Sequence, residues 1–356
     1  MSTTDVPAGI HYENVSRFFA ENIEGGDAPL TFTLIGDGRS NLTYMVTAGD
    51  RRWVMRRPPL GHVLPTAHDM VREYRVLSAL SNTDVPVPRP LALCEDTSVN
   101  EYPFYVMEYR DGVIISSDLP EGYATTPEER RAISIALIDT LVKLHAVDYE
   151  AVGLGDFGRP AGYLERQVRR WSEQWERSKT GELPEIDELI RRLRASLPES
   201  PAPTIVHGDY RLGNMALDPK DPGKVVAIFD WEMSTLGDPL SDLGYTLVYW
   251  GNPDDPEERL NLRPGARVTT QEGFLTREQL VEEYAKRSGR DVENITWYEV
   301  FALYKLAVIT EGIYARHLQG KTYGKGFEGL QRTAPRYVEL AFEIASKSSN
   351  PALRGE

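Results

Sequence analysis

The chain has 356 residues, of which 41% are hydrophobic, so it is long enough to bury the core of one large domain or of two lobes. Its formal net charge of −14 argues against a general nucleic-acid-binding protein, which needs a basic surface to displace counterions. Cys94 is the only cysteine, which excludes an intrachain disulfide, and no run approaches the roughly 18 apolar residues of a membrane span. We therefore expect a cytoplasmic protein without a secretory signal that binds neither nucleic acid nor membrane, as a monomer or homodimer.

The first hundred residues are predicted to form a small lobe that mixes strands and helix. Residues 31–49 and 51–57 are rich in β-branched and aromatic side chains, and the turn sequence Thr-Ala-Gly-Asp separates them, which predicts a strand on each side. Apolar residues recur at helical spacing over residues 66–80. Two further strands are expected at residues 91–96 and 104–109.

The pattern then becomes mainly helical. Thr126 and Glu129 form a capping box, with Pro127 at the first helical position. The predicted helix that follows presents apolar residues at regular spacing, namely Ile133, Leu137, Leu141 and Leu144. Aromatic residues at helical spacing in residues 297–318 are expected to lie in a core.

The change from strands to helices falls near residues 108–112. We therefore predict an α+β chain of two lobes with a hinge at this position. Residues 1–109 would form the smaller β-rich lobe, and residues 110–356 the larger, mainly helical lobe.

Three polar residues follow short apolar runs in the second half of the chain. Asp209 ends the motif His-Gly-Asp, Asn214 stands five residues later, and Asp230 ends the run Val-Val-Ala-Ile-Phe. The sequence Asp-Pro-Lys-Asp-Pro-Gly between them is typical of a hairpin turn, which would bring the three side chains together. Phosphoryl transfer needs one carboxylate for the proton of the attacking hydroxyl, and a carboxylate and an amide oxygen for Mg²⁺. The alternative is three unrelated turn residues.

The motifs around these residues resemble a known family. Val-His-Gly-Asp-Tyr-Arg-Leu-Gly-Asn and Ile-Phe-Asp-Trp-Glu-Met-Ser-Thr-Leu-Gly-Asp-Pro are similar to motifs of the aminoglycoside phosphotransferase family, relatives of the eukaryotic protein kinases. The resemblance runs from about Asn14 to about Phe342. Residues 34–46, 56–80 and 162–175 most resemble the branch that is also found fused to acyl-CoA dehydrogenases.

This resemblance implies a fold, a cofactor and residue roles. The chain would adopt the protein-kinase-like two-lobed fold and use ATP as phosphate donor. Asp209 would be the catalytic base, and Asn214 and Asp230 would be the Mg²⁺ ligands. Protein substrates are not expected, because Asp230 is followed by Trp-Glu where protein kinases have Asp-Phe-Gly, and the Ala-Pro-Glu motif is absent from the sequence.

A glycine-containing segment lies where kinases have their phosphate-binding loop. Gly36 and Gly38 match the first two glycines of that loop, and Asn41 replaces the third. Ser40 and Asn41 are expected to donate hydrogen bonds to phosphate oxygens. An ordinary glycine turn is the alternative.

Arg56 stands where kinases have the lysine that binds the α- and β-phosphates. Arginine binds phosphate in a bidentate manner, so the exchange is compatible with nucleotide binding, although a shift of one residue would place Arg57 there instead. Glu73 lies on the apolar face of its predicted helix with Met70 and Leu77, where a charge is costly unless paired. We expect Arg56 to be its partner; otherwise Glu73 lies at the edge of that face and reaches water.

Glu108 and Tyr109 end the last predicted strand of the first lobe. Kinase-like proteins use the backbone at this position to bind the adenine edge, and we expect the same here. A plain buried edge strand is the alternative.

Several other polar residues are expected to be structural. His207 is expected to hydrogen-bond the backbone of its own loop, and His145 to cap the last carbonyls of its helix. Asp238 precedes Pro239 as a helix N-cap, and Asp242 is expected to support the same turn.

Residues 159–181 indicate the kind of acceptor. The segment holds six basic and three acidic residues in a chain that is acidic overall, with Tyr163, Arg166 and Arg170 on one side near Trp171. A basic, aromatic wall suits an anionic acceptor better than a polycationic aminoglycoside. The alternative is a solvated amphipathic helix that buries its tryptophans.

We therefore predict an ATP-dependent, or GTP-dependent, phosphotransferase that acts on the hydroxyl of a small molecule, with a hydroxyacyl-CoA or hydroxy acid as the favoured acceptor. The alternatives are a kinase for choline, homoserine or an amino sugar, including aminoglycosides, and a nucleotide-binding pseudokinase.

Overall fold

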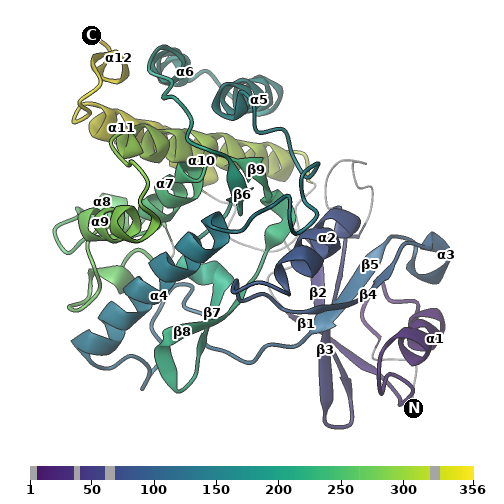
Figure 1. Cartoon of the computed structure of the whole chain (residues 1–356). Coiled ribbons are helices and arrows are strands. Elements are labelled where there is room, and N and C mark those ends of the chain that lie inside the picture. The colour runs from purple at the N-terminus through teal and green to yellow at the C-terminus, as the bar shows by residue number, and fades with distance from the viewer. Residues whose placement is uncertain (1–5, 36–40, 61–68, 264, 321–328) are drawn as a thin grey trace. The chain divides into compact units, whose positions relative to one another are not determined.

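The computed structural model describes residues 6–35, 41–60, 69–263, 265–320 and 329–356 (Figure 1). The chain forms two compact units. The first unit contains residues Met1–Gly112 together with Val226–Glu232, and the second contains Val113–Val225 and Met233–Glu356. Residues 226–232, assigned above to the helical lobe, thus belong to the sheet-containing unit. No helix of the described residues is both long and apolar enough to cross a bilayer.

The first unit is built on a five-stranded antiparallel sheet with the strand order β1-β2-β3-β5-β4 (Figure 1). Its strands are β1 (Thr31–Ile35), β2 (Leu42–Ala48), β3 (Arg51–Arg57), β4 (Pro90–Cys94) and β5 (Phe104–Glu108). Its helices are α1 (Tyr12–Asn22), α2 (Met70–Leu80) and α3 (Thr97–Asn100). The strands and the helix predicted for this part of the chain are therefore present, and β3 has the predicted bounds.

The two faces of this sheet have different roles. Alternate residues of β3 point to opposite faces, so Trp53 packs with Phe19 of α1 in an apolar core while Arg56 points to the other face. Helix α2 packs against β4 and β5. The face that carries Arg56 is therefore the one on which α2 lies.

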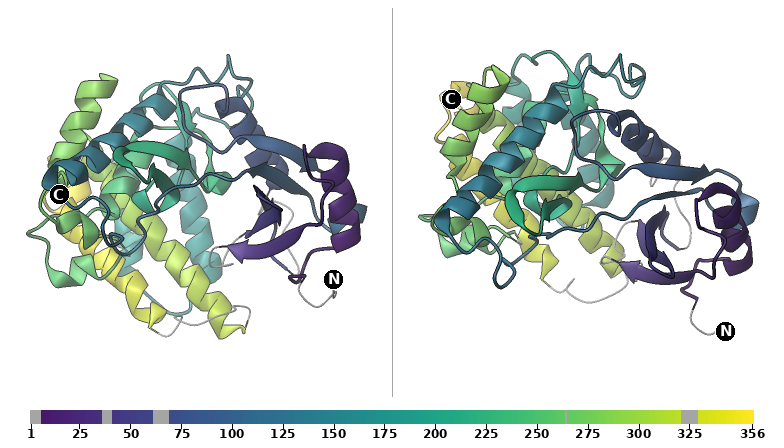
Figure 2. Two further views of the ribbon diagram at one scale, coloured as in Figure 1. Left: turned by 90° about the horizontal axis from the view of Figure 1, so that it is seen from below. Right: turned by 60° about the horizontal axis from the view of Figure 1, so that its bottom comes forward.

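The second unit is mainly helical (Figures 1 and 2). Its helices are α4 (Pro127–His145), α5 (Tyr163–Ser178), α6 (Pro184–Ala195), α7 (Leu240–Val248), α8 (Glu257–Leu260), α9 (Arg277–Ser288), α10 (Ile295–Leu318), α11 (Thr333–Ala345) and α12 (Pro351–Arg354). The 3₁₀ helices η2 (Leu212–Asn214), η4 (Val268–Thr270) and η5 (Leu330–Arg332) also lie here, and η3 (Trp231–Met233) crosses the boundary between the units.

Helix α10 is the centre of this unit, because α5, α6, α7 and α11 all pack against it. Its aromatic residues Trp297, Phe301 and Tyr304 are buried, as predicted. The capping box at the start of α4 is also confirmed: Thr126 accepts a hydrogen bond from the Glu129 N–H, and the Glu129 carboxylate accepts one from the Thr126 N–H.

Two short antiparallel ladders position the motif residues. Strand β6 (Thr204–Val206) pairs with β9 (Thr235–Gly237), and β7 (Met215–Asp218) pairs with β8 (Asp221–Ile228). The predicted hairpin turn therefore lies between β7 and β8. His207 to Asp209 follow β6 directly, and Asp230 follows β8.

Candidate active site

Arg56 is the centre of a buried polar cluster in the first unit. Its Nε lies 2.9 Å from Oε2 of Glu73, and its Nη2 lies 2.6 Å from Oδ1 of Asp230 and 3.9 Å from Oε2 of Glu232. The Glu73 side chain is only 2% exposed. The predicted pairing of Arg56 with Glu73 is therefore confirmed, and the alternative in which Glu73 reaches water is wrong.

Arg57 lies on the opposite face of the sheet. Its guanidinium donates hydrogen bonds to the carbonyl oxygens of Gly9 and, at 3.2 Å, Pro58. Arg56 is thus the arginine that contacts the carboxylates, whereas its contact with nucleotide phosphates stays a prediction.

Two further side chains complete the hydrogen bonding of Glu73. The Asn41 amide donates to Oε1 of Glu73 at 2.7 Å and to Oε2 of Glu232 at 3.2 Å. The Tyr105 hydroxyl donates to Oε2 of Glu73 at 3.0 Å. Asn41, expected to contact phosphate, therefore supports the carboxylate cluster in this structure. Gly36, Gly38 and Ser40 lie outside the described residues.

Among the described residues, the carboxylates of Glu73, Asp230 and Glu232 lie around the Arg56 guanidinium. Burial, together with the charges of Asp230 and Glu232, raises the pKa of Glu73 to about 7, although Arg56 and the Tyr105 hydroxyl act in the opposite direction. Burial alone would lower the pKa of Arg56, but Glu73 and the other carboxylates raise it above its ordinary value. Arg56 therefore stays charged.

Asp230 adopts an unusual backbone conformation at the end of β8. Its φ of 66° lies in the left-handed region that residues other than glycine seldom adopt. The next residue is anchored, since the Trp231 indole donates a hydrogen bond to the Ile228 carbonyl oxygen at 3.0 Å. Such strain is typical of functional sites, where the surrounding structure fixes one side chain in a required direction.

Asp209 and Asn214 meet in the second unit. The Asn214 amide donates to Oδ2 of Asp209 at 2.7 Å and to its carbonyl oxygen at 2.8 Å. The amide nitrogen is thus used within the loop, and the amide oxygen is the group that suits a metal ion. Asp230 belongs to the first unit, so its convergence with these two residues stays a prediction.

The two predicted ligands are of the chemical type that binds Mg²⁺. A carboxylate from Asp230 and an amide oxygen from Asn214 are the hard oxygen ligands that this ion prefers. Within the described residues, no group of three or more His, Cys, Asp or Glu side chains forms a metal site by itself.

Asp242 holds the backbone of the His-Gly-Asp loop. Its carboxylate accepts hydrogen bonds from the N–H groups of His207, at 2.7 Å, and Gly208, at 2.8 Å, and Nε2 of His145 lies 3.3 Å away. Burial alone would raise the pKa of Asp242, but the interaction with His145 and the other hydrogen bonds hold it below its ordinary value. Asp242 therefore carries a buried negative charge that fixes the loop.

This arrangement corrects two expectations about structural residues. His145 does end α4, but its ring contacts the Tyr284 hydroxyl, at 2.8 Å, and Asp242, so it does not cap helix carbonyls. Asp242 supports the loop before Asp209 through its carboxylate. His207 behaves as expected, because its Nδ1 accepts a hydrogen bond from the Asp209 N–H at 3.2 Å.

The end of β5 only partly suits an adenine site. The N–H of Glu108 donates to the Arg89 carbonyl oxygen at 2.9 Å and is therefore already used. The Tyr109 ring stacks with Arg52, whose Cζ lies 4.3 Å from the ring centroid. Nucleotide binding by Glu108 and Tyr109 stays a prediction that now rests on their remaining backbone groups.

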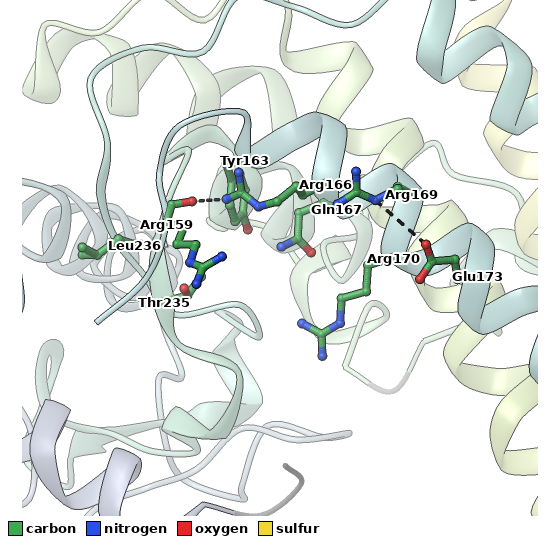
Figure 3. Close-up of a pocket in the computed structure, with 9 residues that line it drawn as sticks. All are labelled: Arg159, Tyr163, Arg166, Gln167, Arg169, Arg170, Glu173, Thr235 and Leu236. Atoms are coloured by element: carbon green, nitrogen blue, oxygen red, sulfur yellow. Dashed lines mark hydrogen bonds and ion pairs between the residues drawn. The ribbon is translucent and has the colours of Figure 1, made fainter. Parts of the chain in front are cut away.

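An arginine-lined pocket of about 340 Å³ lies along the start of α5 (Figure 3). All three residues that were predicted to bind the phosphate acceptor line this pocket, together with further arginines. The charged and aromatic residues of its lining are Arg159, Tyr163, Arg166, Arg169, Arg170 and Glu173. In Figure 3 the side chains of Arg159, Gln167 and Arg170 extend into the same space. Trp171 and Trp175 are buried, so the helix is amphipathic as well as pocket-forming.

The arginines of this pocket are not equivalent. The Arg166 guanidinium donates hydrogen bonds to the carbonyl oxygens of Arg159 and Ala161, which fixes the chain before α5. Arg169 is paired with Glu173 at 3.9 Å. Arg166 is therefore a support of the pocket wall, and Arg159 and Arg170 are better placed to bind a ligand.

Two basic residues near Asp209 were missed in the sequence. Arg211 lies with its Nε 3.3 Å from Oδ1 of Asp209, and Lys305 of α10 donates to the Gly208 carbonyl oxygen at 2.7 Å. The signal for Arg211 was its place two residues after Asp209. The signal for Lys305 was its place as the single charge in the apolar run from Val300 to Thr310.

The arrangement of strands, helices and motif residues is that of a protein-kinase-like fold. Residues 31–273 match the Phosphotransferase enzyme family, and the chain belongs to this family. The predicted α+β, kinase-like two-lobed fold is thereby confirmed. The crystal structure of a provisionally assigned aminoglycoside phosphotransferase from Ralstonia eutropha has a TM-score of 0.80 and 33% identity, and covers 95% of this chain and 99% of its own.

Other relatives share the fold or part of their length. The structure of an aminoglycoside phosphotransferase in a ternary complex with AMP-PNP and hygromycin B has a TM-score of 0.60 at 13% identity. The match covers 95% of this chain and 99% of that protein. Mouse acyl-CoA dehydrogenase family member 10 is 35% identical over 90% of this chain and 30% of its own length. Rat acyl-CoA dehydrogenase family member 11 is 36% identical over 90% of this chain and 41% of its own length. The chain thus spans less than half of these curated relatives.

Proposed function

We propose that the protein transfers the γ-phosphate of ATP to a hydroxyl group of a small anionic acceptor. The observation that carries this proposal is the contact of Arg56 with both Glu73 and Asp230, the charge arrangement that a phosphotransferase of this fold needs around the nucleotide. An intact arrangement of this kind favours an active enzyme over a nucleotide-binding pseudokinase.

Each residue has a distinct role in the proposed reaction. Asp209 accepts the proton of the acceptor hydroxyl as its oxygen bonds to the γ-phosphorus, and the bond from that phosphorus to the ADP oxygen breaks. Asn214 orients the Asp209 carboxylate, and its amide oxygen, with Asp230, would hold Mg²⁺. Bound Mg²⁺ would neutralise phosphate charge. Arg56 binds the α- and β-phosphates while Glu73 holds its guanidinium.

The pocket along α5 supports an anionic acceptor. Its several arginines and single glutamate give it a positive charge in an acidic chain, and arginine binds carboxylates and phosphates through paired hydrogen bonds. A hydroxyacyl-CoA or a free hydroxy acid carries such groups beside its hydroxyl. The names of the mouse and rat relatives, acyl-CoA dehydrogenase family members, agree with an acyl-CoA-type acceptor.

An acceptor screen tests the proposal. The purified chain is incubated with ATP or GTP, Mg²⁺ and one of several acceptors: hydroxyacyl-CoA thioesters, the free hydroxy acids, choline, homoserine and an amino sugar. We expect acceptor-dependent ADP release with a hydroxyacyl-CoA or hydroxy acid, and a loss of at least about a hundredfold in D209N. ADP release that is absent with every acceptor, or unchanged in D209N, would reject the proposed function.

A further inference from the structure

Lys305 is a buried cation for which the described residues provide no carboxylate in an ion pair. It lies in the middle of α10 and is 8% exposed. Its Nζ donates a hydrogen bond to the Gly208 carbonyl oxygen at 2.7 Å, and lies 4.7 Å from the ring centroid of Tyr245 and 5.7 Å from that of Trp171. No carboxylate in the described parts of the chain forms an ion pair with it. One carbonyl and two aromatic faces therefore surround the ammonium group.

Such a group is costly for folding. Burial lowers the pKa of Lys305 to about 8, although the nearby charges of Asp209 and Asp242 act to raise it. An apolar side chain of similar length would fill the same space in α10 without this cost. The position of Lys305 therefore indicates a function other than stability.

The carbonyl that Lys305 binds belongs to the peptide bond that joins Gly208 to Asp209. Gly208 has a φ of 86°, and a Cβ atom there would lie 2.7 Å from the Met233 carbonyl oxygen, so only glycine fits. The Asp242 carboxylate accepts hydrogen bonds from the N–H groups of His207 and Gly208, which precede this peptide bond in the chain. The Asp209 N–H of this peptide donates to Nδ1 of His207 at 3.2 Å, and Lys305 binds the carbonyl oxygen at its other edge, so the two contacts together fix the peptide plane immediately before the Asp209 side chain.

We propose that Lys305 is a positioning residue for Asp209: its ammonium group fixes the Gly208–Asp209 peptide and supplies a positive charge beside the base, and the protonated form is required for phosphate transfer. This inference rests on the proposed function, in which Asp209 accepts the hydroxyl proton. Loss of the Lys305 proton above pH 8 would remove the charge, so phosphate transfer would fall as the pH rises through about 8.

Asp242 and Tyr245, which face Nζ from α7, keep one charge state in this pH range. Asp242 of α7 stays ionised, because hydrogen bonds hold its pKa below the ordinary value against the effect of burial. Tyr245 of α7 stays neutral, because burial raises its pKa well above 10. Asp209 from the loop and Arg170 from α5 are the remaining charges that act on Lys305. Lys305 is therefore the group whose titration near pH 8 the profile would report.

The test compares K305M and K305R with wild type in the acceptor assay from pH 6.5 to 10. Wild-type kcat should fall at alkaline pH with an apparent pKa near 8. K305M should lower kcat at pH 7 by about tenfold and change the KM values for ATP and for the acceptor by less than about threefold. In K305M the decrease of kcat near pH 8 should be absent. K305R, which stays charged, should restore part of kcat and move the alkaline fall above about pH 9.5.

Two measurements separate positioning from a purely structural role. First, urea unfolding should show that K305M is at least as stable as wild type, because a buried charge is removed. Second, K286M makes the same substitution on the exposed face of α9 and should leave activity unchanged. A K305M enzyme with wild-type kcat, or with the alkaline fall still near 8, would overturn the inference alone. A wild-type chain that phosphorylates no acceptor would overturn the proposed function, and the inference with it.

Discussion

Glu73 accepts hydrogen bonds from Asn41 and Tyr105 and forms an ion pair with Arg56. It is nevertheless buried, and the carboxylates of Asp230 and Glu232 act on it. Its pKa of about 7 lies above the ordinary value of about 4.5, so between these values the folded chain binds a proton that the unfolded chain has lost. The contribution of Glu73 to the free energy of unfolding is therefore highest at low pH and falls as the pH rises to about 7.

E73Q is expected to remove this pH dependence. The free energy of unfolding of E73Q minus that of wild type should rise by on the order of 2–3 kcal/mol from pH 4.5 to 7.5, since one pKa unit corresponds to about 1.4 kcal/mol. Urea denaturation at several pH values measures this difference. The KM for ATP should increase in the same variant, because Arg56 loses its buried charge partner.

The exposed Glu165 provides a matched control for this prediction, because E165Q makes the same chemical change on the surface of α5. The difference between E165Q and wild type should not show the rise with pH that is expected for E73Q. If the difference for E73Q does not rise with pH either, the pKa of Glu73 is not raised on folding, and the pKa argument is wrong.

The partner of Glu73 was predictable from the sequence because a charge on an apolar helix face needs a partner. The roles of Asn41, Tyr105 and Glu232 were not, since nothing in the local sequence says that residues about 190 positions apart meet. Lys305 carried a similar signal, a charge within an apolar helix, but in an aromatic-rich run the hydrophobic pattern dominated the interpretation.

At the scale of elements, the most distinctive feature is the pocket that α5 forms with the chain before it. Arg170 extends into the pocket, with its Cζ 5.9 Å from the Trp171 ring centroid, whereas Arg166 is tied to backbone carbonyls. Only the first kind of arginine keeps its hydrogen-bond donors for a ligand.

R170A should therefore weaken an anionic acceptor specifically. We expect KM for a hydroxy acid or hydroxyacyl-CoA to rise by about tenfold with little change in kcat, which is the effect of losing one charge-assisted hydrogen bond in both ground and transition states. Steady-state kinetics of ADP release measure both constants.

R177A, an exposed position near the end of the same helix, is the control and should leave both constants unchanged. R166A should instead lower the free energy of unfolding, because two carbonyl contacts are lost. If R170A binds the anionic acceptor as well as wild type does, the pocket is not the acceptor site.

The elements themselves were largely predictable, because periodicity and capping are local properties. The strands of the first unit, the capping box of α4 and the buried face of α2 all follow from such patterns. The hydrogen bonds of His145 were not predictable, since its partners Tyr284 and Asp242 come from α9 and α7, far along the chain. Tertiary packing decided the role of this residue, and no local pattern reports it.

At the scale of the whole molecule, the proposed mechanism joins residues from both compact units. Asp209 and Asn214 belong to the second unit, and Arg56, Glu73 and Asp230 belong to the first. The link is the proposal that Asn214 and Asp230 are ligands of one Mg²⁺ ion. Two ligands of one ion must depend on each other energetically, which gives a test that requires no geometry.

A double-mutant cycle of N214A, D230N and the combined variant measures this coupling. Each single change should raise the Mg²⁺ concentration needed for half-maximal ADP release by at least about tenfold. The combined change should cost at least about 1 kcal/mol less than the sum of the two, because the second substitution removes a ligand from a site already lost. D27N, an exposed change in the first unit, should leave Mg²⁺ activation unchanged. If the two effects add within about 0.5 kcal/mol, the residues act independently, and a shared ion cannot be the link between the two units.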